Sequence, residues 1–222
     1  MQFSNETLTV LKNFSTINPS IAFKPGKVLS TISPTKTILA RADIAEEIES
    51  SAAVYDLNRF LATLSLLDEP DVSFGDKRFD ISKNRKVVHY TYTSEEMIVT
   101  PPSKELKMPS SEIEFDVSWE ELESVIRAAG VLQLPDIEFS TDGNTISISA
   151  VTAKNPTSDR YDIEIDSDNA TTPDDPMKMF IKQENLKLLP RDYHVSLSSR
   201  GMAHFKSSDI EYFIALDAGG NK

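Results

Sequence analysis

The stretch DLNRFLATLSLL, residues 56–67, carries the clearest periodic signal in this sequence. One stripe of large apolar residues stands at positions 57, 60, 61, 64 and 67. The first four follow the i, i+3, i+4, i+7 spacing of one helix face. Asp56 is a good N-cap, because its carboxylate can accept a hydrogen bond from an unpaired amide of the first turn. We therefore expect a helix that begins after Asp56 and buries one apolar stripe.

Three more segments show the same helical period. The first runs from about residue 4 to residue 16. The second opens at Ser118 with the capping-box pattern S-x-x-E, and Gly130 is a natural place for it to end. The third is predicted over residues 182–189, because the residue before Pro190 is pushed away from helical geometry.

Between these helices, apolar and polar residues alternate, which predicts antiparallel strands. The alternating segments are residues 36–42, 72–81, 86–92, 137–139, 145–151, 160–165, 193–197 and 210–216. A helix followed by about three strands occurs four times along the chain. This order predicts an α+β fold of two similar domains, each with antiparallel sheets and two helices that cover one face.

The segment TPPSKELKMPSS, residues 100–111, separates the second and third repeats. Its three prolines stiffen the chain and interrupt helix and sheet pairing. We therefore expect an N-terminal domain over residues 1–100, a connector over residues 101–111 and a C-terminal domain over residues 112–222.

The composition excludes several kinds of site. The 222 residues contain no cysteine, so disulfides, thiolate metal sites and thiol nucleophiles are absent. The N-terminus does not resemble a signal peptide, and no apolar run is long enough to span a bilayer, so a cytoplasmic protein without membrane contact is expected. The net charge of −12 taken as a total argues against a nucleic-acid partner.

No motif for catalysis or for a cofactor is present. The glycines form neither G-x-G-x-x-G nor a phosphate loop. His89, His194 and His204 are far apart and do not form H-E-x-x-H, and no G-x-S-x-G elbow supports a serine nucleophile. We therefore expect no enzymatic activity, no metal and no cofactor.

The positive charges fall in a consistent place. Each predicted helix carries a cation on the side opposite its apolar stripe, although simple solvation of an amphipathic helix would explain any one of them. These residues are Lys12, Arg59, Arg127, Lys182 and Lys187, with Lys178 just before the last predicted helix.

Two segments resemble a known family. VLKNFSTIN, residues 10–18, and AVYDLNRFLATLSLL, residues 53–67, are similar to the sliding clamp of T-even-type bacteriophages, and length and element order match along the whole chain. The resemblance implies a homotrimeric ring around duplex DNA that tethers the replicative DNA polymerase. Helices would line the hole, and the six cations would make weak, sequence-independent contacts to phosphates.

The resemblance also implies contacts between subunits and with partners. The ring would join head to tail through sheet edges, for which we predict residues 86–92 and 160–165, although either strand could instead be internal to its sheet. The predicted interface residues are Lys86, Val88, Tyr90, Tyr92, Tyr161, Ile163 and Ile165. Partners would dock near the connector on Leu106, Met108, Pro109, Ile214 and Leu216, which could instead pack against their own domain.

The expected partners are the DNA polymerase, a clamp-loader ATPase and transcription factors, in the cytoplasm of the infected bacterial host. A rival interpretation is a non-enzymatic, β-rich structural or assembly protein of a phage, which would not need the helix cations. A hydrolase with an unrecognised site is a third possibility, but no group of residues can be nominated for it.

Overall fold

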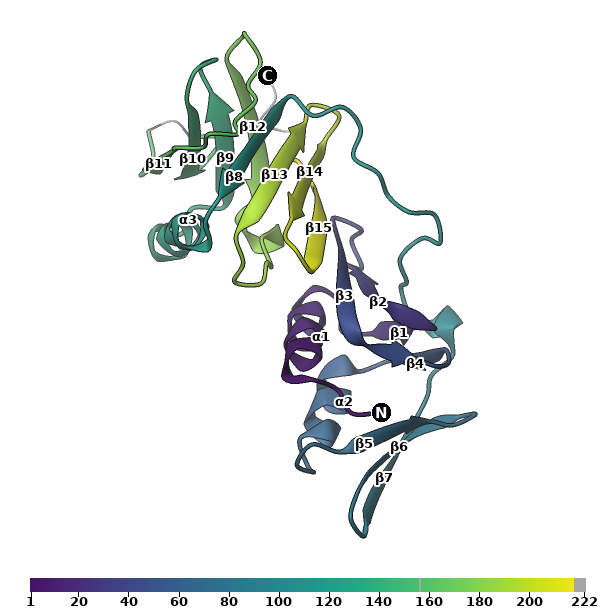
Figure 1. Ribbon diagram of the computed structural model, residues 1–222. Coiled ribbons are helices and arrows are strands. Elements are labelled where there is room, and N and C mark those ends of the chain that lie inside the picture. The colour runs from purple at the N-terminus through teal and green to yellow at the C-terminus, as the bar shows by residue number, and fades with distance from the viewer. Residues whose placement is uncertain (156, 218–222) are drawn as a thin grey trace. The chain divides into compact units, whose positions relative to one another are not determined.

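In the computed structural model, which describes residues 1–155 and 157–217, the chain divides into two compact units, Met1–Lys104 and Glu105–Lys222 (Figure 1). The boundary between the units lies inside the proline-containing stretch 100–111. Each unit is described by itself below.

Unit 1 combines two helices with short antiparallel sheets. Strand β1 pairs with β4, β2 pairs with β3, and β5, β6 and β7 form a three-stranded sheet in that order. The elements are α1 (Asn5–Ile17), β1 (Ile21–Phe23), β2 (Gly26–Ile32), β3 (Ile38–Ile48), β4 (Ala52–Val54), α2 (Leu57–Leu64), β5 (Asp71–Phe74), β6 (Arg78–Lys83), β7 (Lys86–Thr91) and the 3-10 turn η1 (Glu95–Met97).

In its described residues, unit 2 contains one α-helix and two four-stranded antiparallel groups. One has the order β11-β10-β9-β12, and the other has the order β8-β13-β14-β15. The elements are β8 (Ile113–Val117), α3 (Trp119–Leu132), β9 (Asp136–Thr141), β10 (Ile146–Val151), β11 (Tyr161–Ile165), β12 (Met177–Lys182), the 3-10 turn η2 (Gln183–Asn185), β13 (Tyr193–Ser198), β14 (Met202–Lys206) and β15 (Ile210–Ala215).

Each unit is built from two half-repeats that exchange strands. In unit 2, β8 of the first half pairs with β13 of the second, and β12 of the second half pairs with β9 of the first. Unit 1 follows the same plan, because β4 pairs with β1, and Met1 and Val72 exchange two main-chain hydrogen bonds. The prediction of two similar α+β domains is therefore confirmed.

Aromatic side chains fill the core of each unit. In unit 1, Phe60 of α2 packs against Phe79 of β6, with ring centroids 4.8 Å apart. The eight-residue helix α2 is too short to be stable alone, and the burial of Leu57, Phe60 and Leu64 holds it in place. In unit 2, Phe139 of β9 lies 6.2 Å from Phe115, a ring of the opposing sheet.

The predicted helix over residues 182–189 is wrong. Lys182 ends strand β12, and only Gln183–Asn185 form a single 3-10 turn. The following backbone is held by tertiary contacts, because the Leu189 amide donates to the Tyr212 hydroxyl and the Leu189 carbonyl accepts from the Tyr193 hydroxyl. Unit 2 therefore has one α-helix in its described residues instead of the two that were expected.

Helix α3 also differs at its end from the prediction. It continues through Gly130 to Leu132 and ends where Gln133 adopts a left-handed conformation with φ of 55°. The Gln133 amide bonds to the Ala129 carbonyl, which satisfies one of the last free carbonyls of the helix.

Candidate nucleic-acid interface

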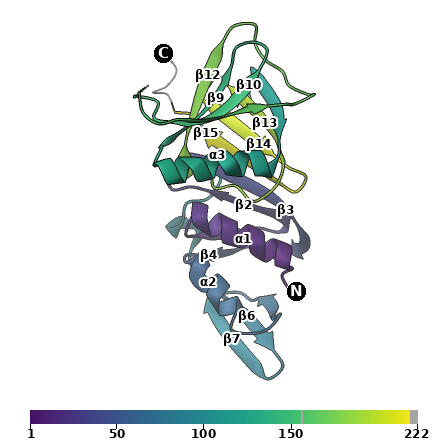
Figure 2. The same ribbon diagram turned by 90° about the vertical axis from the view of Figure 1, so that its left-hand side faces the viewer.

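Helices α1 and α2 lie on the same side of unit 1 (Figure 2). Their first turns are fixed by side-chain caps, since the Thr7 amide donates to Ser4 Oγ at 3.2 Å and the Arg59 amide donates to Asp56 Oδ1 at 2.9 Å. The apolar stripe of each helix faces the core. Lys12 and the side chain of Arg59 are consequently exposed.

Helix α3 has the same construction in unit 2. Its capping box is complete, with the Glu121 amide donating to Ser118 Oγ and the Ser118 amide donating to Glu121 Oε2. Leu122, Val125 and Ala129 are buried, and Arg127 is exposed on the opposite side.

The three helix cations share one electrostatic property. In the described ranges, no ion pair holds Lys12, Arg59 or Arg127 in place, so each charged group is available to an incoming ligand. A flexible, unpaired cation on a helix surface can contact a phosphate without reading the bases. This arrangement suits sequence-independent contact with nucleic acid.

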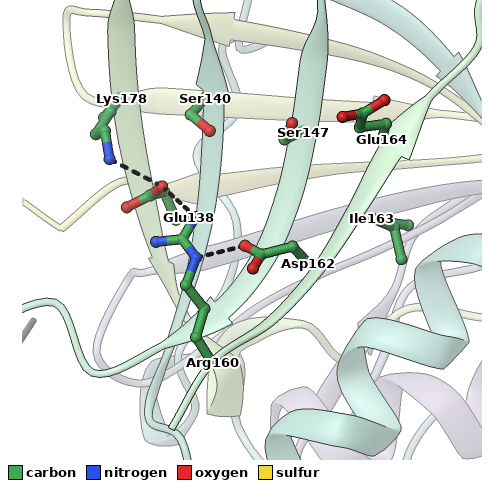
Figure 3. A pocket seen from close by; sticks show the side chains of 8 residues that line it. All are labelled: Glu138, Ser140, Ser147, Arg160, Asp162, Ile163, Glu164 and Lys178. Atoms are coloured by element: carbon green, nitrogen blue, oxygen red, sulfur yellow. Dashed lines mark hydrogen bonds and ion pairs between the residues drawn. The ribbon is translucent and has the colours of Figure 1, made fainter. Parts of the chain in front are cut away.

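Lys178 and Lys182 lie in a different place from the predicted one. Both belong to strand β12, and Lys178 points to the sheet face that carries Glu138 and Asp162 (Figure 3). That face is opposite to α3, because the Tyr161 hydroxyl lies 3.5 Å from Ser124 of the helix and the next residue, Asp162, points the other way. The structure therefore gives no support for a shared helical surface with Arg127.

The charges of these lysines are also paired. Lys178 Nζ lies 3.2 Å from Glu138 Oε1, and Lys182 Nζ lies 2.6 Å from Asp136 Oδ1 and 2.8 Å from Asp217 Oδ2. Hydrogen bonds to Asp136 and then Asp217 raise the pKa of Lys182. Lys187 follows η2 and is half-buried.

The predicted docking residues fall into two groups. Leu106, Met108 and Pro109 are partly exposed, as a docking surface requires. Ile214 and Leu216 are buried, so a partner could reach them only after a rearrangement.

The predicted interface strands are both sheet edges. In the part of the chain that the structure describes, β7 pairs only with β6, and β11 pairs only with β10. The alternative, that these strands are internal to their sheets, is therefore wrong. Tyr92 lies just beyond β7, and its ring centroid is 4.6 Å from that of Phe79.

Sequence reasoning missed a polar network on one face of the sheet β11-β10-β9-β12. This face is the one opposite to α3 and is called the outer face below. Arg160 and Lys178 both contact Glu138, whose side chain is only 5% exposed. Glu138 stands at the polar position of the alternating segment 137–139, where an exposed residue is expected, so the sequence contains no signal of its burial.

Comparison with known proteins gives the family. Residues 4–100 match the family described as DNA polymerase processivity factor, and residues 114–218 match the gp45 sliding clamp, C terminal. The sliding clamp of Vibrio phage KVP40 is 31% identical over 98% of this chain and over its own full length. The chain belongs to the sliding clamp family. The sliding clamps of Escherichia phage RB69 and Enterobacteria phage T4 are 30% and 29% identical, over 98% of this chain and 97% of theirs.

Solved structures of other clamps have the same fold. The PCNA of Thermococcus kodakaraensis has a TM-score of 0.71 at 14% identity, and the match covers 97% of this chain and 98% of that one. The beta clamp of Helicobacter pylori also gives 0.71 at 14% identity, over 100% of this chain and 68% of the longer one. The expected clamp fold and the resemblance to T-even-type phage clamps are confirmed.

Membership in this family makes the clamp a DNA polymerase processivity factor, and the rival interpretation as a structural or assembly protein is not supported. Helices in the described ranges are all too short or too polar to cross a membrane. Within the same ranges, no group of three acidic or histidine side chains could hold a metal ion.

Proposed function

We propose that this clamp encircles duplex DNA as a homotrimeric ring and tethers the replicative DNA polymerase to its template without itself being an enzyme. The observation that carries the proposal is the set of unpaired cations, Lys12, Arg59 and Arg127, on three helix faces of a protein with net charge −12. Topology, not affinity, would keep the ring on DNA. Few phosphate contacts then suffice, and weak contacts allow sliding.

The ring would close through β7 of one subunit and β11 of the next. Both edges offer free main-chain donors and acceptors, so pairing would continue one sheet into the other. Apolar side chains would meet on the inner face, with Val88 and Tyr90 of β7 against Tyr161 and Ile163 of β11. A head-to-tail contact of this kind closes only if the rotation per subunit matches a ring.

Charge complementarity supports this pairing. The hairpin of β6 and β7 has four basic residues and one acidic residue apart from His89, whereas residues 159–166 around β11 have four acidic residues and one basic residue. The basic residues of the hairpin are Arg78, Lys83, Arg85 and Lys86, and the acidic residues around β11 are Asp159, Asp162, Glu164 and Asp166. Opposite charges favour β7 with β11 over either strand with its own copy.

The remaining partners would act at the ring's surface. A clamp-loader ATPase would open the ring, and polymerase and transcription factors would dock on the connector at Leu106, Met108 and Pro109. We place this activity in the cytoplasm of the infected bacterium, where phage DNA is replicated.

A primed circular template tests the central proposal. With polymerase and clamp loader present, adding the clamp should lengthen the DNA made each time a polymerase binds the template. Unchanged product length would contradict tethering. A topological control tests encirclement itself. Clamps loaded on circular DNA should be retained in high salt and lost after the circle is cut, whereas a groove-binding protein would show no difference between the two templates.

A further inference from the structure

A chain of ion pairs crosses the outer face of the sheet β11-β10-β9-β12 (Figure 3). The Arg160 guanidinium Nη2 donates to Glu138 Oε1 on β9 at 3.0 Å and to Ser149 Oγ on β10 at 2.9 Å. Its Nε donates to Asp162 on β11. Lys178 on β12 reaches the same Glu138 oxygen from the other side. The network therefore links all four strands.

Glu138 is the centre of this network and is unusually buried for an acid. Its neighbours in sequence, Ile137 and Phe139, face the core, and its own side chain is 5% exposed on the opposite face. A buried carboxylate is unfavourable unless its charge is paired and its oxygens accept hydrogen bonds. Arg160 and Lys178 supply both, so loss of either cation should leave the buried carboxylate less well compensated.

The geometry has a specific consequence for β11. Among the described residues, the edge strand β11 is held by main-chain hydrogen bonds to one neighbouring strand, β10. Arg160, directly before the strand, reaches over β10 to β9. The beginning of β11 is therefore tied to its neighbour β10 and also to the next strand, β9. A strand anchored in this way has less freedom to fray or to change its twist.

We propose that Arg160, held by Glu138, is a positioning residue that keeps the β11 edge in the shape that receives β7 of the neighbouring subunit. This inference rests on the proposed ring joint. Glu138 does not itself form the contact, since it is buried inside its own unit. It prepares the edge before the second subunit arrives, which lowers the ordering cost of association.

Glu138→Gln tests the inference with little change in shape. The amide keeps an acceptor for Arg160 but removes one of the two carboxylates that hold it. We therefore expect the trimer to dissociate at about tenfold higher protein concentration, which is about a hundredfold change in the monomer–trimer dissociation constant, or about 2.8 kcal/mol per trimer. Arg160→Gln should have a similar effect. Because both substitutions remove the same interaction, the double variant should be little worse than either single variant.

Lys182→Gln is a matched control. Lys182 pairs with buried Asp136 on the same two strands, β9 and β12, but does not contact Arg160. Sedimentation equilibrium over a dilution series gives the dissociation constant, and urea unfolding of each variant gives its stability. If Arg160 is a positioning residue, Glu138→Gln and Arg160→Gln should form weaker trimers and Lys182→Gln should not. This difference should hold even where the three variants lose similar amounts of unfolding free energy.

Two other outcomes would overturn the inference in distinguishable ways. If the wild-type protein forms a trimer and Glu138→Gln has the same dissociation constant, the ring is retained and only the positioning role is rejected. Wild-type protein that remains monomeric at every concentration would reject the ring joint, and the positioning role with it.

Discussion

The hydroxyl group of Tyr193 donates a 2.7 Å hydrogen bond to the main-chain carbonyl of Leu189. The Leu189 amide donates in turn to the hydroxyl of Tyr212, at 3.1 Å. Both tyrosines are buried, and burial raises the pKa of each hydroxyl above its usual value. Two neutral hydroxyls therefore bind both main-chain groups of one residue, in a segment where apolar spacing alone predicts a helix.

Tyr193→Phe should destabilise unit 2. The substitution keeps the ring but leaves the buried Leu189 carbonyl without its partner, which costs about 1–3 kcal/mol. Urea unfolding followed by circular dichroism measures the loss. Tyr55→Phe is the control, because Tyr55 is 64% exposed and should change the unfolding free energy little. Equal stability of the two variants would show that water replaces the lost donor.

Replacement of the helix cations should impair function without affecting assembly. In the triple variant Lys12→Gln, Arg59→Gln, Arg127→Gln, each phosphate contact that is lost should lower the slope of log affinity against log salt by about 0.9. Product length on a primed circle should fall, while the trimer mass is retained.

A triple variant of Lys27, Lys154 and Arg200, each changed to glutamine, carries the same net charge and is the matched control. These three cations are exposed, and none of them belongs to a helix. If both triple variants lose processivity equally, total charge, and not the helix faces, accounts for the interaction with DNA.

The capping box of α3 should contribute measurably to stability. Ser118→Ala removes the acceptor of the Glu121 amide and should cost about 0.5–2 kcal/mol in unfolding free energy. Ser94→Ala is a suitable comparison, because Ser94 occupies the N-cap of η1 without a side-chain capping bond. A loss as large at Ser94 as at Ser118 would refute the capping contribution.

The pH dependence of stability should contain a contribution from His204. Burial lowers its pKa below 6.5, against the opposing hydrogen bond to Glu211. The unfolded chain therefore binds a proton near pH 6.5 that the folded chain does not, and the free energy of unfolding falls as pH decreases below this value. His204→Gln should reduce the decrease between pH 7.5 and pH 5.5, measured by urea titration.

The carboxyl groups with lowered pKa, such as Asp116 and Glu46, are a separate contribution. They destabilise the protein only when they become protonated at more acidic pH, and they do so in both proteins. Identical pH profiles for wild type and His204→Gln would exclude the histidine contribution.

The elements that the sequence predicted well have strong local signals. Helix α2 has a complete apolar stripe and an aspartate N-cap, and α3 has both halves of a capping box, so local interactions and core burial favour the same structure. The Asp142-Gly143 turn, a sequence typical of hairpins, joins β9 to β10, with Gly143 at φ of 98°. The single strand predicted over residues 72–81 is two strands in the structure, β5 and β6, because Gly75 begins a turn between them.

The errors arise where distant residues determine the local structure. Leu186, Leu188 and Leu189 are buried, but tyrosines from β13 and β15 decide how their backbone runs. Likewise, Lys178 and Lys182 were assigned to a helix surface, whereas their partners, Glu138 and Asp136, come from a strand about 40 residues earlier (46 for Lys182). Neither relationship leaves a periodic trace in the sequence.

The exchange of first strands between half-repeats has a consequence for how the protein folds. Strand β8 is synthesised first in unit 2, yet its partner β13 emerges only after β9, β10, β11 and β12. Neither sheet of the unit can be completed by the first half alone, because the pairs β9–β12 and β8–β13 form only after strands of the second half have been synthesised. Such late, non-local pairing slows folding and makes it cooperative. If the two halves of unit 2 are produced as separate chains, divided between β11 and β12, each fragment alone should be unfolded.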